Sequence, residues 1–282
     1  MGSDDFYPEE RPVREAEIGA FLMNRTPVTN AQFACFVAET GHVSFAEIAP
    51  DPRDYPDMDP ALAVPGSIVF LPPDRRVRLS DGPSWWHFVL GAHWRRPAGP
   101  GSDVRGMEDH PVVHVGFTDA LADAAWAGKQ LPSEAEWERA ARGRLEGAPY
   151  AWDDEFLPDG KRMAKTWEGD SPHANAAPEG LERTAPVGSY PANSYGLFDL
   201  IGNIWEWTAE VGSEGSKEKG RCAGLAASAP GETPVRILKG GSHMCAPEYR
   251  HAIARPRDGS NRSIRRLRML AGASTPEHIT GG

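Results

Sequence analysis

The sequence has few cysteines and no long hydrophobic run. Only Cys35, Cys222 and Cys245 occur among its 282 residues, and so small and odd a number argues against a disulfide framework. No apolar run reaches the roughly 18 residues that a membrane helix needs, so we expect no membrane partner. The first residues, MGSDDFYPEER, lack the apolar segment of a secretion signal, and we therefore expect a cytoplasmic protein.

The common nucleotide and metal signatures are also missing. There is no glycine-rich phosphate loop, HExxH or CxxC. His110 and His114 occur in HPVVH, but Pro111 and the β-branched residues predict a strand over 112–117. We interpret both histidines as structural, because the helical spacing that would let them share a metal is not expected there.

The charge is mostly of one sign. The net charge is −10, which disfavours nucleic acid as a partner because phosphates are repelled by an acidic surface. The exception is a group of arginines within 255–268. We interpret it as a solvated strand edge, with docking of an acidic ligand or peptide as the alternative.

Glycine, proline and tryptophan are abundant: the chain contains 30, 26 and 9 of them. Such a composition predicts irregular backbone between short elements, and it excludes long helical bundles. We find no linker or internal repeat. The sequence therefore predicts one α+β domain over 1–282 with little regular secondary structure, and flexible tails at 1–11 and 271–282.

Capping signals predict the helices. Thr29 and Gln32 form a T-x-x-Q capping box for a helix that ends at Gly41 and holds Cys35 as a small packing residue. A second box, Ser133 and Glu136, begins another helix. Thr118 is expected to cap a helix between these two, and 235–239 is expected to be a strand.

Two segments concentrate chemical groups. In 199–206, Asp199 and Glu206 flank a glycine turn, and the carbonyls of Gly202 and Ile204 would complete an oxygen cage of the kind that calcium prefers. In 239–245, paired glycines precede Ser242, His243 and Cys245. Ser242 and His243 could lower the pKa of the Cys245 thiol; the alternative is a buried, inert cysteine.

Six blocks in order resemble the formylglycine-generating enzyme family, also called sulfatase-modifying factors. They are MNRTPVTNAQFACFVAETGH, WWHFVLGAHWRRPAGP, DHPVVHVGFTDALADAAWAGKQLPSEAEWERAARG, YAWDDE, TAPVGSYPANSYGLFDLIGNIWEWT and ILKGGSHMC. The resemblance implies a compact, irregular α/β fold, distantly like C-type lectins. It also implies O₂-dependent oxidation of a cysteine in a C-x-P-x-R peptide to formylglycine.

The resemblance implies site residues as well. Cys245 falls on the first of two copper-binding cysteines, with Ser242 and Trp205 lining the same pocket. The second position holds Arg250, so weak copper binding is expected, and the guanidinium could instead stabilise a Cys245 thiolate.

A structural calcium is implied at Asp199, Gly202, Ile204 and Glu206. The positions of a second family calcium fall on Lys165, Thr166, Glu179 and Leu181. An ammonium cannot ligate a cation, so we expect Lys165 to replace this calcium and to pair with Glu179. The alternative is that both side chains point to solvent.

The sequence thus predicts a formylglycine-generating-like oxidoreductase whose partner is a sulfatase or another peptide. A non-catalytic peptide-binding paralogue is the alternative. An iron-dependent sulfoxide synthase ranks last, because no facial set of histidines is evident.

Overall fold

Two helices begin at the predicted capping boxes. The computed structural model describes residues 1–4, 11–53, 59, 62–73, 85–211 and 236–245. Helix α1 (Asn30–Thr40) follows Thr29, whose hydroxyl accepts the amide of Gln32 at 3.3 Å, and it ends at Gly41 with φ +70°. Helix α3 (Glu134–Arg142) follows Ser133, which exchanges the matching bonds with Glu136. Both predictions are confirmed.

The segment before helix α2 (Phe117–Trp126) differs from the prediction. Gly116, and not Thr118, is the N-cap residue, and Asp119 accepts the Gly116 amide at 2.7 Å. The predicted strand over 112–117 is absent, because His114 has φ +59° and breaks the extended run. Thr118 therefore lies inside the first turn of α2.

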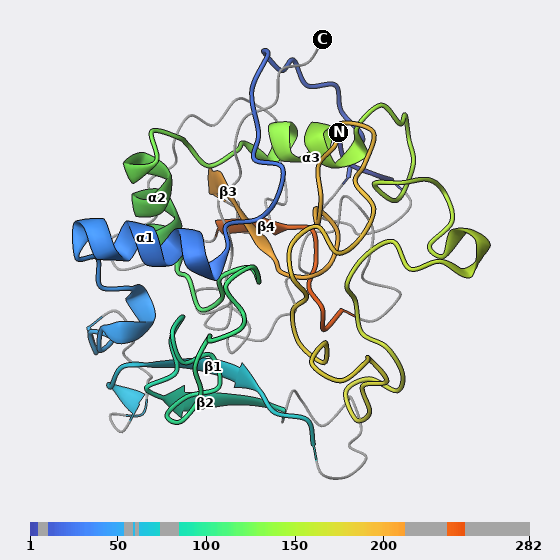
Figure 1. The fold of residues 1–282 in the computed structure, drawn as a ribbon. Helices are drawn as coiled ribbons and strands as arrows, with labels where there is room; N and C mark the ends of the chain where they lie inside the picture. The colour runs from blue at the N-terminus through green and yellow to red at the C-terminus, as the bar shows by residue number, and fades with distance from the viewer. Residues whose placement is uncertain (5–10, 54–58, 60–61, 74–84, 212–235, 246–282) are drawn as a thin grey trace.

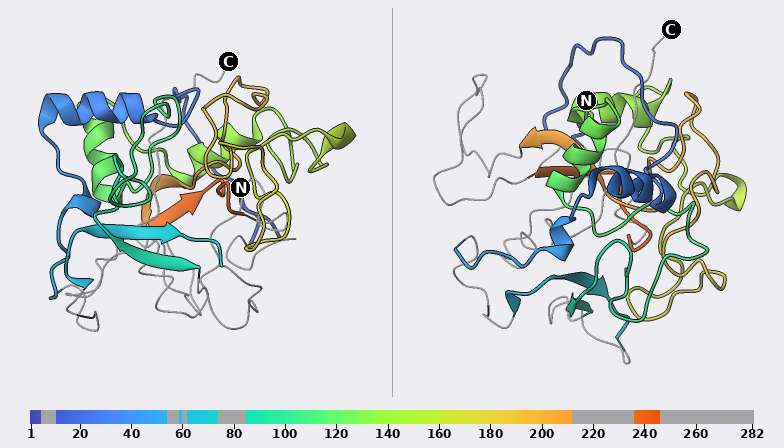
Figure 2. Two further views of the ribbon diagram at one scale, coloured as in Figure 1. Left: turned by 60° about the horizontal axis from the view of Figure 1, so that its bottom comes forward. Right: turned by 60° about the vertical axis from the view of Figure 1, so that its left-hand side comes forward.

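Two small antiparallel sheets lie apart from one another in Figure 1. Strand β1 (Gly66–Phe70) pairs with β2 (Trp86–Leu90), and β3 (Glu206–Val211) pairs with β4 (Arg236–Lys239) across a register shift. Short 3-10 helices occur at Phe45–Glu47 and Pro158–Gly160. Figure 2 shows the same arrangement from two further sides, with long irregular segments between the elements.

Two apolar clusters form the core. One lies beneath α1 and α2 and includes Phe33, Trp94 and Trp207. The other surrounds α3 and includes Trp137, Leu200 and Ile201. Helix α3 lies above β3 and β4 in Figure 1, and it contacts both strands. The buried Trp207 of β3 and Leu238 of β4 belong to the first cluster, which therefore supports the sheet that precedes Cys245.

The chain is a single mixed α/β domain with few helices and short sheets. This agrees with the fold class expected from the sequence, because glycine and proline interrupt nearly every periodic segment. No helix of the described residues is long and apolar enough to cross a membrane. The predicted C-terminal tail and the 255–268 arginines lie outside the described residues.

Candidate functional site

Cys245 lies at the end of a tight turn that follows β4. The turn, residues Ser242–Cys245, is closed by a bond from the Cys245 amide to the Ser242 carbonyl at 3.0 Å. The Ser242 amide donates to the Cys245 sulfur at 3.2 Å, and the Ser242 hydroxyl lies 3.8 Å from it. A sulfur that receives donors in this way is stabilised as a thiolate. We call residues 242–245 the Cys245 turn.

A second segment holds the Cys245 turn in place. The Trp167 amide donates to the Cys245 carbonyl at 3.2 Å. Cys245 is half-buried and in no disulfide. Cys35 is exposed on α1, so its predicted packing role is wrong. Cys222 and Arg250 lie outside the described residues.

Asp199 and Glu206 form the second candidate site, which we call the acidic pair. Both side chains are buried. Glu206 accepts the indole N–H of Trp137 at 2.5 Å, and Asp199 accepts the Gly188 amide at 2.6 Å. Burial raises the pKa of Asp199 to about 6. Burial, with a smaller contribution from the charge of Asp199, raises the pKa of Glu206 to about 8.

Among the residues described, no Lys, Arg or His forms an ion pair with Asp199 or Glu206. The carbonyls of Gly202 and Ile204, both in buried residues, receive no hydrogen bond within the same part of the chain. These two carboxylates and two carbonyls are hard oxygen donors of the type calcium takes. No group of three or more His, Cys, Asp or Glu side chains that could hold a metal ion occurs in the described ranges, so any site here must use main-chain carbonyls as well.

Lys165 pairs with a different acid from the one predicted. Its ammonium is buried and lies 3.7 Å from Glu168, which also pairs with Arg162 at 3.1 Å. Glu179 is exposed. The predicted Lys165–Glu179 pair is therefore wrong, because the i,i+3 neighbour reaches the ammonium first.

The remaining predicted positions have structural surroundings. Trp205 is partly buried against the core beneath α1 and α2. His110 contacts the Thr184 hydroxyl at 3.0 Å, and His114 bridges Ser67 and the Pro97 carbonyl. Both histidines are thus structural, as the sequence predicted.

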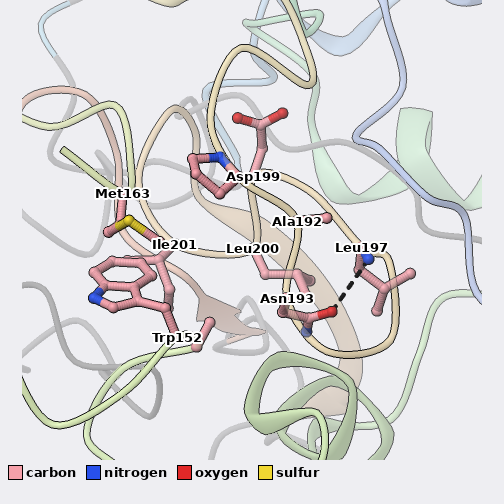
Figure 3. A pocket seen from close by; sticks show the side chains of 10 residues that line it. Trp152, Met163, Ala192, Asn193, Leu197, Asp199, Leu200 and Ile201 are labelled. Carbon is pink, nitrogen blue, oxygen red and sulfur yellow. Dashed lines mark hydrogen bonds between the residues drawn. The ribbon is translucent and has the colours of Figure 1, made fainter. Parts of the chain in front are cut away.

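A small pocket is lined in part by Asp199 of the acidic pair (Figure 3). Trp152 and Met163 lie side by side on one wall, and the Asp199 carboxylate points away from them. Asn193 accepts the Leu197 amide at 3.1 Å at the opposite end. Cys245 does not line this pocket.

Comparison with known proteins shows the family of the chain. Residues 1–267 match the family described as "Sulfatase-modifying factor enzyme 1-like domain". The chain belongs to this family. It is 48% identical over 256 residues to the formylglycine-generating enzyme of Mycobacterium tuberculosis, covering 89% of this chain and 85% of that protein.

The chain is also similar to two further proteins. The chain is 41% identical over 212 residues to "Inactive C-alpha-formylglycine-generating enzyme 2" of Bos taurus, covering 74% of this chain and 66% of that protein. The structure of PvdO from Pseudomonas aeruginosa is similar in fold, with a TM-score of 0.55 at 22% identity, covering 100% of this chain and 90% of that one. Family membership therefore includes relatives named as enzymes and relatives named as inactive.

Copper, which the family resemblance implied, does not fit the donors that the structure describes. Cys245 supplies one sulfur, and the other described thiol, Cys35, is exposed on α1. Position 250, where the family resemblance places a second cysteine, holds arginine. A single thiolate is too few soft ligands for tight binding of Cu(I).

Sequence reasoning missed a buried ion cluster beside the site. The Lys239 ammonium lies 3.1 Å from Glu134 and 3.8 Å from Glu138, and all three side chains are buried. We call these residues the Lys239 cluster. The i,i+4 spacing of the two acids on one face of α3 was a visible signal, but their helix-start position suggested only an interaction with the helix dipole.

Proposed function

We propose that this chain is an O₂-dependent oxidoreductase of the formylglycine-generating type, with Cys245 as its reactive thiol. The observation that supports this most strongly is the amide of Ser242 directed at the Cys245 sulfur, at 3.2 Å. An inert cysteine in a core has no need of such a donor, whereas a thiolate gains from it. Trp205 and Arg250 are proposed to complete the site, on the strength of the family resemblance alone.

The proposed reaction acts on a cysteine of a peptide with a C-x-P-x-R sequence, such as that of a sulfatase. Conversion of the CH₂–SH group to an aldehyde and H₂S, with one oxygen atom gained, removes two electrons from the substrate. Reduction of O₂ to water takes up four electrons. The remaining two must come from a thiol reductant, which the assay therefore contains.

The residues of the turn have distinct parts in this proposal. The Ser242 amide holds negative charge on the Cys245 sulfur, and the Ser242 hydroxyl lies close enough to exchange a proton with it. The Trp167–Cys245 main-chain bond fixes the sulfur's distance from the neighbouring segment. No step is assigned to copper, and we expect only weak copper binding.

We also propose one structural calcium ion at the acidic pair, held by Asp199, Glu206 and the carbonyls of Gly202 and Ile204. Support comes from two buried carboxylates without a cationic partner and two buried carbonyls without a donor in the described chain. A bound Ca²⁺ would satisfy all four groups. Its proposed role is to fix the turn that connects Asp199 to Trp205.

A non-catalytic peptide-binding paralogue is the second candidate function. Arg250 in place of a cysteine favours it. Under this alternative the chain would hold an extended peptide without oxidising it, and substitution of Cys245 would leave peptide binding unchanged.

One assay separates the two functions. The chain is incubated with a C-x-P-x-R peptide, O₂ and a thiol reductant, with and without Cu(I), and mass spectrometry follows the replacement of SH by an aldehyde oxygen. Oxidation that Cys245→Ser abolishes, and that the matched control Cys35→Ser keeps, supports the oxidoreductase. Binding of the peptide without any change in its mass supports the paralogue.

A further inference from the structure

Asn203 connects three separate segments of the chain near the thiol. The residue is fully buried. Its amide donates to the Lys165 carbonyl at 2.7 Å. Its side chain exchanges two hydrogen bonds with the main chain of Ala185, at 3.0 and 3.1 Å.

The main-chain carbonyl of Asn203 reaches the Cys245 turn. It accepts the amide of His243 at 2.9 Å and the Nδ1 atom of the same histidine at 3.0 Å. Two bonds to one residue fix both its backbone and its ring. The third connected segment is therefore the turn that presents Cys245.

The backbone of Asn203 explains why this residue type occurs here. Its φ is +58°, in the left-handed region that most side chains avoid and that asparagine tolerates. The preceding Gly202 also lies against the Lys165 carbonyl, where a Cβ would collide. Only a residue that tolerates this conformation can aim its carbonyl at His243 while its side chain bonds to Ala185.

The same contact determines the tautomer of His243. A carbonyl oxygen can only accept, so the Nδ1 atom must carry the proton. Burial lowers the pKa of His243 to about 4, and the charges of Arg183 and Lys165 act in the same direction. The ring therefore stays neutral at neutral pH, with its Nε2 lone pair unprotonated.

We propose that Asn203 is a positioning residue for the Cys245 thiol: its side-chain bonds to Ala185 fix the main-chain carbonyl that holds His243, and thereby the Ser242 amide, in the arrangement that directs an N–H group at the sulfur. This inference rests on the proposed thiol chemistry of Cys245. Asn203 does not touch the sulfur itself. Its effect passes through His243 and the closed turn.

The test compares Asn203→Gly with Asn193→Gly. Both asparagines bond to main-chain groups of other segments, and Asn193 does so at Ala140, Tyr195 and Leu197, outside the proposed site. Glycine keeps the left-handed backbone available and removes only the side chain. Both variants are made in a Cys35→Ser, Cys222→Ser background and studied in excess Ca²⁺ and in EGTA, so that metal effects are separated.

The first readout is the nitrogen NMR spectrum of the His243 ring. We expect the Nδ1–H tautomer in the parent protein and in Asn193→Gly, and a mixture of tautomers in Asn203→Gly. The second readout is the rate at which iodoacetamide modifies Cys245 as a function of pH. Because a hydrogen bond to a charged group stabilises it by an amount equivalent to about one pKa unit or more, we expect the midpoint to rise by about one unit in Asn203→Gly only.

Three results would overturn the proposal: an unchanged tautomer in Asn203→Gly, an unchanged midpoint, or equal midpoint shifts in the two glycine variants. If Asn203→Gly does not fold, His243→Phe removes the ring bond while keeping an aromatic side chain. It should raise the midpoint in the same direction, and no rise would equally refute the proposal. Neither readout needs peptide oxidation, so a failure of the proposed enzyme activity is seen separately.

Discussion

The molecule buries two groups of carboxylates in neighbouring places, and only one of them has its own cation. In the Lys239 cluster, an ammonium lies between Glu134 and Glu138. In the acidic pair, Asp199 and Glu206 have no such partner among the described residues. Burying an unpaired charge is costly, so each group must be neutralised in some way. The first is neutralised by the chain itself, and the second requires protons or a metal ion.

Trp137 lies next to both groups of carboxylates, but it carries no charge that could neutralise either of them. It belongs to α3, between Glu134 and Glu138 in the sequence, and its indole donates to Glu206. Because the indole is neutral, its hydrogen bond to Glu206 does not let the Lys239 ammonium neutralise the acidic pair. The comparison therefore predicts that the two groups respond to different perturbations.

The largest effect is expected from Lys239→Met. Both glutamates would lose their buried ammonium; Glu134 would keep only Arg14, at 3.8 Å, and Glu138 only Arg142, at 3.1 Å. Removal of one partner from a buried ion pair costs about 3–5 kcal/mol. Urea denaturation measures the free energy of unfolding. The control, Lys161→Met at an exposed position, should change this free energy little. Equal effects of the two substitutions would show that the Lys239 cluster contributes no net stability.

Removal of calcium should give the next largest effect, with a defined pH dependence. The folded pKa values of Asp199 and Glu206, about 6 and about 8, lie above those of the free side chains. The metal-free folded state then binds more protons than the unfolded chain between pH 4 and 8. Its free energy of unfolding must therefore fall as the pH rises through that range.

Excess Ca²⁺ should remove most of this pH dependence, because the ion replaces the protons. Calorimetry at several pH values, in EGTA and in Ca²⁺, checks the expectation. Identical melting temperatures in the two buffers at pH 8 would contradict it, since the carboxylates are then ionised and most in need of a cation.

A smaller effect is expected from Lys165→Met, by about 1–2 kcal/mol, because only one carboxylate is involved and it keeps a second cation. Glu168 remains 3.1 Å from Arg162 when the Lys165 ammonium is removed. The same urea experiment gives the value. A loss as large as that of Lys239→Met would mean that Arg162 does not neutralise Glu168.

The smallest effect is expected from Ser133→Ala, which removes the cap of α3 and costs about 1 kcal/mol. Thr29→Ala, the matching change on α1, should cost about the same. In double-mutant cycles with Lys239→Met, only Ser133→Ala should be non-additive, because its helix holds both partners of Lys239. If both double mutants are additive, the cap of α3 and the Lys239 cluster stabilise the fold independently, and the prediction is wrong.

The sequence predicted the parts of this fold that depend on local interactions. The caps at Thr29 and Ser133 involve residues three apart. Strand β4 was predicted from the short apolar run that it contains. His114 could not be placed in the same way, because its left-handed backbone is set by bonds to Ser67 and Pro97. The segment therefore bends where its β-branched neighbours predicted a strand.

In the candidate site, too, the features that depend on long-range contacts could not be predicted. The family blocks located Cys245, Ser242 and the acidic pair by position. The role of Asn203 depends on contacts with residues up to forty positions away, and such contacts leave no local pattern in one sequence. The partner of Lys165 was missed for the opposite reason, because a nearer acid, Glu168, was overlooked in favour of a more distant one.

Gly202 and Gly240 lie where main-chain segments approach too closely for a side chain. A Cβ on Gly202 would strike the Lys165 carbonyl, and one on Gly240 would lie 2.6 Å from the Leu200 carbonyl. The Gly202 amide also donates to the Gly240 carbonyl at 2.9 Å. The main chain at Lys165, at 200–202 and at Gly240 is thus in direct contact. A shorter side chain elsewhere can relieve a clash with a side chain, but it cannot move a main-chain carbonyl, so a second substitution of that kind would not make room for a Cβ at Gly202 or Gly240.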